Sequence, residues 1–472
     1  MLQKYHLSKI SSANFSLVII LLIIVLFPLF KGGNYPGVMS LFMFSTVMIF
    51  LLSLSEITYE RDKVWLFVWG VFTGAVLVHA LIVPILFAND RFFDNGIDPI
   101  ILERIGRRSV SVVRTVEVWS FFTAMWLFAW RISILQLKQI SIVLTALFFV
   151  SLFQAVYGLA HFILEASSVL GLWTKEYYLN DATGTFVNRN HFSGMLAIAS
   201  PLIVSGLLLS RPLIFPSLSK ELRVTVAALY LMVLILALVS SHSRMGVVAA
   251  IFGLLVYLVV MVKSLSRQSK KGLIVFIGLT FVFLFMFALW FGFDDIVKRY
   301  ADLENGNSRL DVWLAMFGMP LDVWLIGIGP GAFENIFKII TPSHFSVRFV
   351  QAHNDYLEFV FEFGLLLSLL IIFAFFLWFK KSVVSSYGYY LKSGVCGSIA
   401  AISLHSVVDF NLQIPASALF VWLSVGLLAN RSMVLDQTNG EGSLNGDRKR
   451  RSKPKLRFPK NKREWLAFFR SD

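Results

Sequence analysis

Four short polar stretches interrupt an otherwise apolar chain, and each contains arginine or histidine. They are Thr183–Phe192, Ser240–Arg244, Asn307–Gly331 and Gln351–Tyr356. Arginine presents a planar fork of N–H donors that suits phosphate and carboxylate groups, and histidine can accept a proton near neutral pH. The four stretches therefore predict a site that binds an anion and removes a proton, provided that the fold brings them together.

Each stretch also has a purely structural interpretation. Arg189 and Arg244 can anchor helices at a membrane interface, and Asn354 or Asp355 can cap a helix. The run Gly327–Gly331 does not fit a phosphate-binding glycine loop, because no Lys-Ser or Lys-Thr pair follows it. A close backbone turn and a nest of amides for an anion both stay open for this run.

Two pairs of polar residues lie four positions apart, which places each pair on one helix face. His405 and Asp409 are near enough on such a face for a hydrogen bond, and the sequence offers no third ligand for a metal ion. Glu358 and Glu362 fall inside an expected span, where a carboxylate is costly and normally has a partner. We expect an arginine from an outer loop to be the partner of Glu362.

Membrane helices must position these residues. The 472-residue chain is 57% hydrophobic and 15% charged, its mean hydropathy is +0.74, and soluble domains carry about one-quarter charged residues. Because a span needs roughly 20 apolar residues, we expect an all-α, polytopic transmembrane helical bundle with about 12 spans. The expected spans lie near 15–30, 37–55, 64–87, 116–130, 140–164, 192–210, 224–240, 245–262, 272–292, 356–379, 393–408 and 413–430.

Charge in the connecting segments predicts the orientation. With the N-terminus inside, the inner segments hold mostly lysine and the outer ones mostly arginine. We expect a transmembrane domain over 1–430, with outer loops at about 88–115 and 293–355, and a basic cytoplasmic tail over 431–472. A basic segment directly after a span binds anionic lipid headgroups, so membrane lipids rather than nucleic acid are the expected partner of the tail.

The polar stretches resemble, in the same order, the O-antigen ligase and polymerase family of bacterial envelope proteins. The matching segments fall within 150–430 and are Gly184–Phe186, Asn188–Phe192, Ser243-Arg244, Arg309 with Trp313, Gly327–Gly331, Ala352–Leu357 with Glu362, and His405–Asn411. The resemblance implies a GT-C-like helical architecture in the bacterial inner membrane, with an extracytoplasmic active site.

The same resemblance implies an enzyme that needs no metal and no cofactor. Its donor is a glycan on undecaprenyl pyrophosphate, and its acceptor is a hydroxyl of the lipid A core, of another glycan or of another molecule. The residues expected to bind the pyrophosphate are Arg189, Arg244 and Arg309. The residues expected at the chemical step are His353, Asp355 and Arg244. The expected supporting residues are Asn354, Glu362, His191, His405 and Asp409.

Two alternatives from other classes stay open. A transporter or flippase of lipid-linked sugars would place ionisable residues or broken helices near the midplane of related halves, whereas here the charges gather at one interface. A non-enzymatic scaffold of envelope polysaccharide assembly would use the basic tail for docking. Within the family, the Asp409-Phe410-Asn411 ending slightly favours a polymerase over a ligase.

Overall fold

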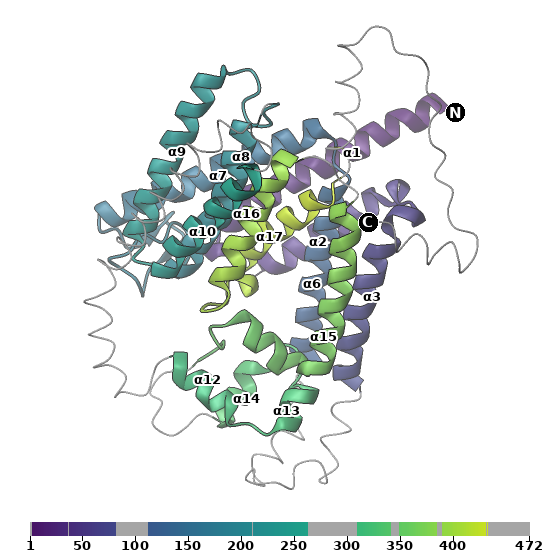
Figure 1. Cartoon of the computed structure of the whole chain (residues 1–472), viewed down its shortest axis with the longest axis vertical. Coiled ribbons are helices and arrows are strands. Elements are labelled where there is room, and N and C mark those ends of the chain that lie inside the picture. The colour runs from purple at the N-terminus through teal and green to yellow at the C-terminus, as the bar shows by residue number, and fades with distance from the viewer. Residues whose placement is uncertain are drawn as a thin grey trace. The chain divides into compact units, whose positions relative to one another are not determined.

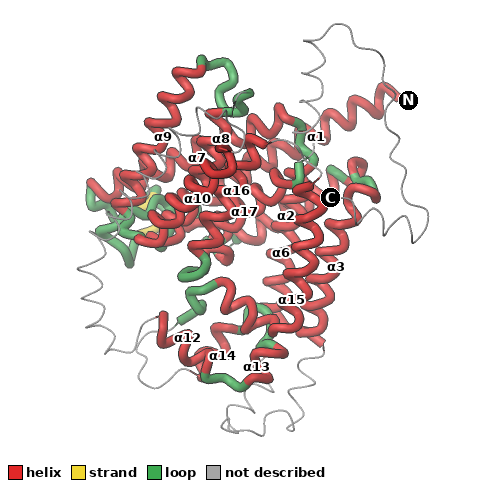
Figure 2. Tube along the Cα trace, in the orientation of Figure 1, coloured by secondary structure: helices red, strands yellow, loops and turns green. Residues whose placement is uncertain are grey.

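The structure is a computed structural model that describes residues 2–35, 37–81, 112–209, 211–262, 309–340, 349–384, 389–430 and 432. These residues are almost entirely helical, as Figure 1 and Figure 2 show, so the expected all-α helical fold is confirmed. The expected span at 272–292, most of the loop at 88–115, parts of the loop at 293–355 and nearly all of the tail lie outside the described residues.

Every other expected span overlaps one long helix. These helices are α1 (Leu2–Leu26), α2 (Val38–Leu52), α3 (Tyr59–Leu81), α6 (Val112–Ser133), α7 (Leu137–Ile163), α8 (Arg189–Leu208), α9 (Lys220–Ser240), α10 (Arg244–Val262), α15 (Asp355–Val384), α16 (Tyr389–His405) and α17 (Pro415–Leu428). By length and composition, six of them (α3, α7, α8, α9, α10 and α15) can cross a membrane. The total of about 12 spans stays a prediction.

Local sequence signals begin several of these helices. Asn188 precedes α8, and its side-chain oxygen accepts a hydrogen bond from the Asn190 N–H at 2.8 Å. Ser219 caps α9 in the same way through the Leu222 N–H. Pro415 is the first residue of α17, a position where its missing N–H costs nothing. The caps satisfy amides that helix starts leave without partners.

Helix α8 lies at the centre of the bundle and contacts α7, α9, α10, α16 and α17. Its most apolar window is 94% buried, whereas the corresponding windows of α9 and α10 are 28% buried. Close packing here depends on small residues, because a β-carbon on Gly253 of α10 would lie 2.7 Å from the Gly397 carbonyl of α16. Glycine and serine let membrane helices approach this closely.

Helix α15 is broken at Gly364, where φ is +74°. The break frees the Phe363 carbonyl from the helical hydrogen-bond pattern, and this carbonyl accepts a hydrogen bond from His79 Nε2 of α3 at 2.9 Å. A β-carbon on Gly364 would overlap the Ile326 backbone. The N-terminal part of α15 is therefore a separate short helix that packs against the turn after Ile326.

Three short helices, α12 (Arg309–Phe317), α13 (Leu321–Ile326) and α14 (Phe333–Ile340), form a layer next to the N-terminal part of α15 (Figure 1). Their shared core includes Met316, Phe333, Phe337 and Phe361. Because α12 begins with Arg309, this layer positions one of the residues that the sequence singled out.

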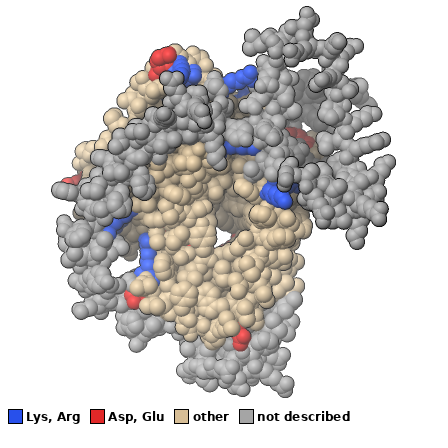
Figure 3. Space-filling model, viewed as in Figure 1, with Lys and Arg blue, Asp and Glu red and all other residues tan. Residues whose placement is uncertain are grey.

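The only described strands, within the residue ranges given above, form a two-residue antiparallel hairpin between α7 and α8. Strand β1 (Ser168–Val169) pairs with β2 (Trp173–Thr174), with Ser168 opposite Thr174 and Val169 opposite Trp173. Elsewhere, most of the described surface in Figure 3 carries no Lys, Arg, Asp or Glu. Such a surface is suited to lipid, in which helices satisfy their own backbone hydrogen bonds.

Candidate active site

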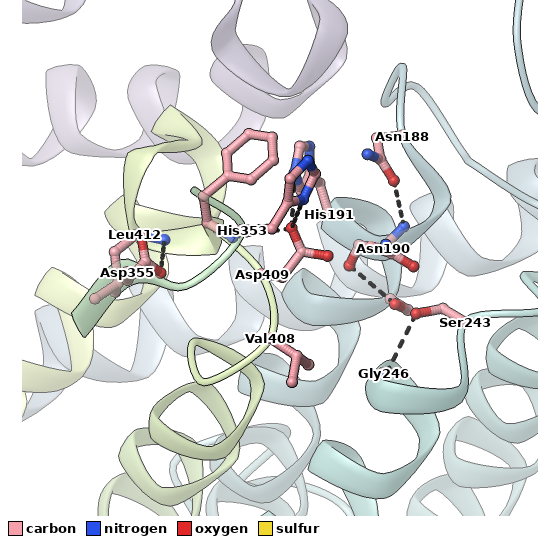
Figure 4. Close-up of polar contacts among 12 residues, drawn as sticks. Asn188, Asn190, His191, Ser243, Gly246, His353, Asp355, Val408, Asp409 and Leu412 are labelled. Carbon is pink, nitrogen blue, oxygen red and sulfur yellow. Dashed lines mark hydrogen bonds and ion pairs between the residues drawn. The ribbon is translucent and has the colours of Figure 1, made fainter. Parts of the chain in front are cut away.

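The first residues of α8 and α12, the loop before α15 and the turn after α16 meet at one polar cluster. We call it the Asp409 cluster, and its members are Asp409, His191, His353 and Arg309. His191 Nε2 lies 3.6 Å and His353 Nδ1 lies 3.8 Å from Asp409 Oδ1. Arg309 Nη2 lies 3.4 Å from Asp409 Oδ2, and its Nη1 donates to the Val408 carbonyl. Figure 4 shows both imidazoles against Asp409.

Asp409 is a nearly fully buried carboxylate with one close hydrogen bond, two neighbouring imidazoles and one neighbouring guanidinium. The Phe410 N–H donates to Oδ1 at 2.9 Å. Burial by itself would raise the pKa of Asp409, but the two neighbouring histidines and the charge of Arg309 hold this pKa well below its usual range. Asp409 is therefore ionised at neutral pH.

The Phe410 ring fixes the two histidines. It makes edge contacts with His191 at a centroid distance of 4.7 Å and with His353 at 4.8 Å. His353 has a φ of +55°, an uncommon conformation for a residue with a β-carbon. Trp313 Nε1 donates a hydrogen bond to the carbonyl of the preceding residue, Ala352, at 2.8 Å. Strained residues of this kind gather at functional sites, so this loop is a good candidate for one.

Among the described residues, neither Asn354 nor Asp355 forms a hydrogen bond with His353. Asn354 caps α15, because its Oδ1 accepts from the Tyr356 and Leu357 N–H groups at 3.1 and 3.0 Å. Asp355 is buried, and its Oδ2 accepts from the Leu412 N–H at 3.1 Å. The carboxylate that faces His353 is instead that of Asp409, while Asp355 ties the start of α15 to the turn after α16 (Figure 4).

Among the described residues, the partner of Glu362 is a backbone N–H group and not the arginine that the sequence predicted. Its Oε1 accepts from the Phe333 N–H at 3.1 Å, at the first residue of α14. The glycine turn before α14 pairs with the same part of α15, because the Gly329 N–H donates to the Glu362 carbonyl at 2.9 Å. The anion at this turn is thus the protein's own carboxylate. Glu358 similarly accepts from the Ala352 N–H at 2.6 Å.

The expected hydrogen bond between His405 and Asp409 does not form. Helix α16 ends at His405, so Asp409 lies on the following turn and faces His191 and His353 instead. The His405 ring is fully buried, and neither ring nitrogen has a hydrogen-bond partner among the described residues. His405 is still within electrostatic range of Asp409, His191 and Arg309.

A second polar cluster surrounds Asp181, a residue that the sequence analysis did not single out. We call it the Asp181 cluster, and its members are Asp181, Arg189, His242 and Lys175. Arg189 Nη1 donates to Oδ2 at 2.9 Å and His242 Nδ1 to Oδ1 at 2.6 Å. Lys175 Nζ donates to the Asp181 carbonyl at 3.0 Å. Burial lowers the pKa of Lys175, and the charge of Asp181 offsets part of this effect.

Arg244 is the first residue of α10, directly after the tight turn that joins α9 to α10. Ser243 caps this helix start, since its Oγ accepts from the Gly246 N–H at 3.3 Å. A β-carbon on Gly246 would overlap Ser193 of α8, so the first turns of α10 and α8 are in contact. The structure thereby places Arg244 at the same end of the bundle as Arg189 and His191.

The Gly184-Thr185-Phe186 segment serves the packing of this end rather than the polar clusters. Gln154 of α7 donates to Thr185 Oγ1 at 2.7 Å and accepts from the Thr185 N–H at 3.0 Å. Thr185 Oγ1 donates in turn to the Pro28 carbonyl at 2.6 Å. These bonds tie the loop before α8 to α7 and to the short 3-10 turn Phe27–Leu29 that follows α1.

The helices and the two clusters define a polytopic membrane protein with a site of arginine, histidine and aspartate at one end of its bundle. Residues 228–372 match the family model of the O-antigen ligases, so this chain carries an O-antigen ligase domain and the resemblance seen in the sequence is confirmed. The matched range includes Arg244, Arg309, His353 and Glu362. A comparison with curated proteins found no match.

The family match gives the coarse function. O-antigen ligase domains occur in membrane glycosyltransferase-like ligases and polymerases, so the protein handles glycans in a membrane, with lipid-linked glycan donors and glycan acceptors as its general partners. The elements outside the matched range supply Arg189, His191 and Asp409, which complete both polar clusters.

Proposed function

We propose that the protein transfers a glycan from undecaprenyl pyrophosphate to an acceptor hydroxyl at the outer face of the bacterial inner membrane. The observation that carries the proposal is the convergence of His353, His191 and Arg309 on the buried carboxylate of Asp409. This arrangement combines a proton acceptor with a cation that can hold a phosphate oxygen. The acceptor is the lipid A core, another glycan or another hydroxyl.

In the proposed reaction, the acceptor oxygen attacks the anomeric carbon of the donor sugar. The bond between this carbon and the pyrophosphate oxygen breaks, and undecaprenyl pyrophosphate leaves with the bonding electron pair. A single displacement of this kind inverts the anomeric carbon. His353 Nε2 takes the proton of the attacking hydroxyl, because Nδ1 is the ring nitrogen that faces Asp409.

Arg189, Arg244 and Arg309 are the proposed ligands of the pyrophosphate. Guanidinium forks placed where negative charge develops stabilise a leaving phosphate, so the proposed mechanism uses no metal ion. Asp409 is the residue that the geometry favours for orienting His353, with His191 beside it. His353 Nδ1 is 3.8 Å from Asp409, and catalytic hydrogen bonds of this length commonly shorten when substrate binds.

The proposed topology places both termini in the cytoplasm and the two clusters outside. Short lysine-containing loops lie at the opposite end of the helices, as the inner side of a membrane protein requires. The basic tail then contacts anionic lipid headgroups of the inner leaflet. Whether the product is a longer polymer or a glycan joined to its final acceptor depends on the acceptor that binds.

The variant His353→Ala tests the chemical step in the purified, full-length protein. We expect transfer to fall by at least about 100-fold, the usual contribution of a general base, while binding of the lipid-linked donor stays within a factor of about three. Loss of donor binding with the same substitution would refute the assignment of His353 as the base.

The envelope of a strain that lacks the gene separates the possible outcomes for the whole protein. Single repeats on their normal acceptor indicate a polymerase, and long glycan left on the lipid carrier indicates a ligase. Repeat units retained on the cytoplasmic side would indicate a flippase and would remove the basis for the catalytic roles proposed here.

A further inference from the structure

Arg189 is held in one orientation by two residues of the loop before α8, Asp181 and Tyr178. Its Nη1 donates to Asp181 Oδ2 at 2.9 Å, and the Tyr178 ring lies against its guanidinium carbon at 5.3 Å from the ring centre. Asp181 is itself fixed, because His242 donates to its other oxygen and its backbone N–H donates to the Tyr178 carbonyl at 3.2 Å. The guanidinium is therefore restrained at one edge and on one face.

The Asp181 cluster carries more positive than negative charge. Arg189 and Lys175 are cations, His242 adds a third when it is protonated, and Asp181 is the only carboxylate in the cluster. The side chains of Asp181 and Arg189 are 10% and 29% exposed, so the ion pair is largely shielded but open on one side. A guanidinium with one edge bound to a carboxylate can still present its other N–H groups to an anion.

Helix α8 connects this cluster to the Asp409 cluster. Arg189 is its first residue and His191 its third, and they contact Asp181 and Asp409 respectively. Two residues of the first turn of α8 thus contact two different aspartates, one in each cluster. Fixing Arg189 before a ligand arrives lowers the ordering cost that binding must otherwise meet.

We propose that Asp181 is a positioning residue of the donor site, which holds the Arg189 fork in the orientation that receives the pyrophosphate. This inference rests on the proposed function. Asp181 itself touches neither the sugar nor the phosphate, so its loss affects donor affinity more than the chemical step.

Two effects of Asp181 on an anion have opposite signs. Its negative charge repels the pyrophosphate, whereas its contact with Arg189 orients the ligand that attracts it. Substitutions separate the two effects. Asp181→Glu keeps the charge and moves the carboxylate by one methylene, and Asp181→Asn removes the charge and keeps an oxygen that can accept from Arg189. Asp181→Ala removes both.

The test measures binding of inorganic pyrophosphate to the full-length protein in lipid nanodiscs by calorimetry. We expect Asp181→Glu and Asp181→Ala each to raise Kd about tenfold, the scale of ordering one long side chain on binding. Asp181→Asn should stay within about threefold of the wild type. In the transfer reaction with extracted lipid-linked glycan, Asp181→Glu and Asp181→Ala should each show a higher donor KM than the wild type and a nearly unchanged kcat.

Glu117→Ala is the matched control. Glu117 also pairs with an arginine, since Arg114 Nη1 lies 2.9 Å from its Oε2, but this pair is exposed and belongs to neither cluster. Its removal should leave the pyrophosphate Kd unchanged. Thermal unfolding of every variant shows whether the protein is still folded, and the comparison of Asp181→Glu with Asp181→Asn holds even if Asp181→Ala does not fold.

The outcomes are distinguishable. A wild-type protein that binds no pyrophosphate would overturn the donor assignment of the proposed function, and the role of Asp181 with it. If the wild type binds pyrophosphate and Asp181→Glu binds it equally well or more tightly, only the positioning role of Asp181 is overturned. A fall in kcat with an unchanged donor KM in this variant would also overturn it.

Discussion

Replacing Asp409 by asparagine removes one charge from the centre of its cluster and preserves the shape. The Phe410 N–H donates to Oδ1 at 2.9 Å, and the amide oxygen of asparagine can accept the same bond. The distances from Asp409 to Arg309, His191 and His353 are 3.4, 3.6 and 3.8 Å. They are longer than a good hydrogen bond, so what the substitution removes is mainly charge attraction.

The expected loss follows from these distances. In the proposed reaction His353 becomes positively charged as it accepts the proton. Two unit charges about 4 Å apart interact by about 4 kcal/mol at an effective dielectric constant of about 20. Arg309 and His191 share the same carboxylate, so we reduce this to about 3 kcal/mol. At about 1.4 kcal/mol for each factor of ten, kcat should fall roughly 100-fold.

The assay compares Asp409→Asn with Asp355→Asn in purified protein, using lipid-linked glycan extracted from a strain that lacks the gene. Asp355 is also buried, but its carboxylate bonds the Leu412 N–H, so its loss should lower stability more than kcat. The reasoning is refuted if Asp409→Asn keeps kcat within about threefold of the wild type. It is equally refuted if Asp355→Asn, folded and present at normal levels, loses more kcat.

Three further predictions follow from the same geometry. Arg244→Lys keeps the charge and loses the fork, so it should abolish most transfer at normal protein levels; an active variant would contradict a bidentate phosphate contact. Gly364→Ala should lower unfolding stability by at least about 2 kcal/mol, because a positive φ and a backbone overlap combine there, whereas Gly74→Ala, with open space around it, is the neutral control in the same thermal melt. Because the pKa of Asp409 is depressed on folding, its stabilising effect is present above its ordinary pKa of 3.8 and lost as pH falls through the folded value. The stability difference between wild type and Asp409→Asn should therefore shrink as pH falls below about 4; a difference that does not change below pH 4 would contradict it.

Hydropathy predicts the helices well because membrane spans must be long and apolar. It does not predict the break in α15, since the apolar run continues on both sides of Gly364 and a single glycine is a weak helix breaker. The break is determined by contacts far away in the sequence, with the glycine turn before α14 and with His79 of α3.

The candidate site was predictable in its residue types and less so in its pairings. The sequence left open an amide nest at Gly327–Gly331 and predicted an arginine partner for Glu362, but it did not predict that the end of this glycine turn supplies the partner. Asp409 was assigned to His405 by helical spacing, and the end of α16 removes that pairing. Asp181 belongs to no motif. Its position two residues before the Thr183–Phe192 stretch was the available signal.

The burial of α8 isolates the site from the bilayer. A mismatch between helix length and membrane thickness is met by tilting or kinking of the helices that face lipid, or by local thinning or thickening of the bilayer. Helices α9 and α10 present most of their surface outward. The α8 window is 94% buried in protein, and its first turn carries both Arg189 and His191. Hydrophobic mismatch therefore acts on the periphery of the bundle, and the spacing between the two clusters should depend little on lipid chain length.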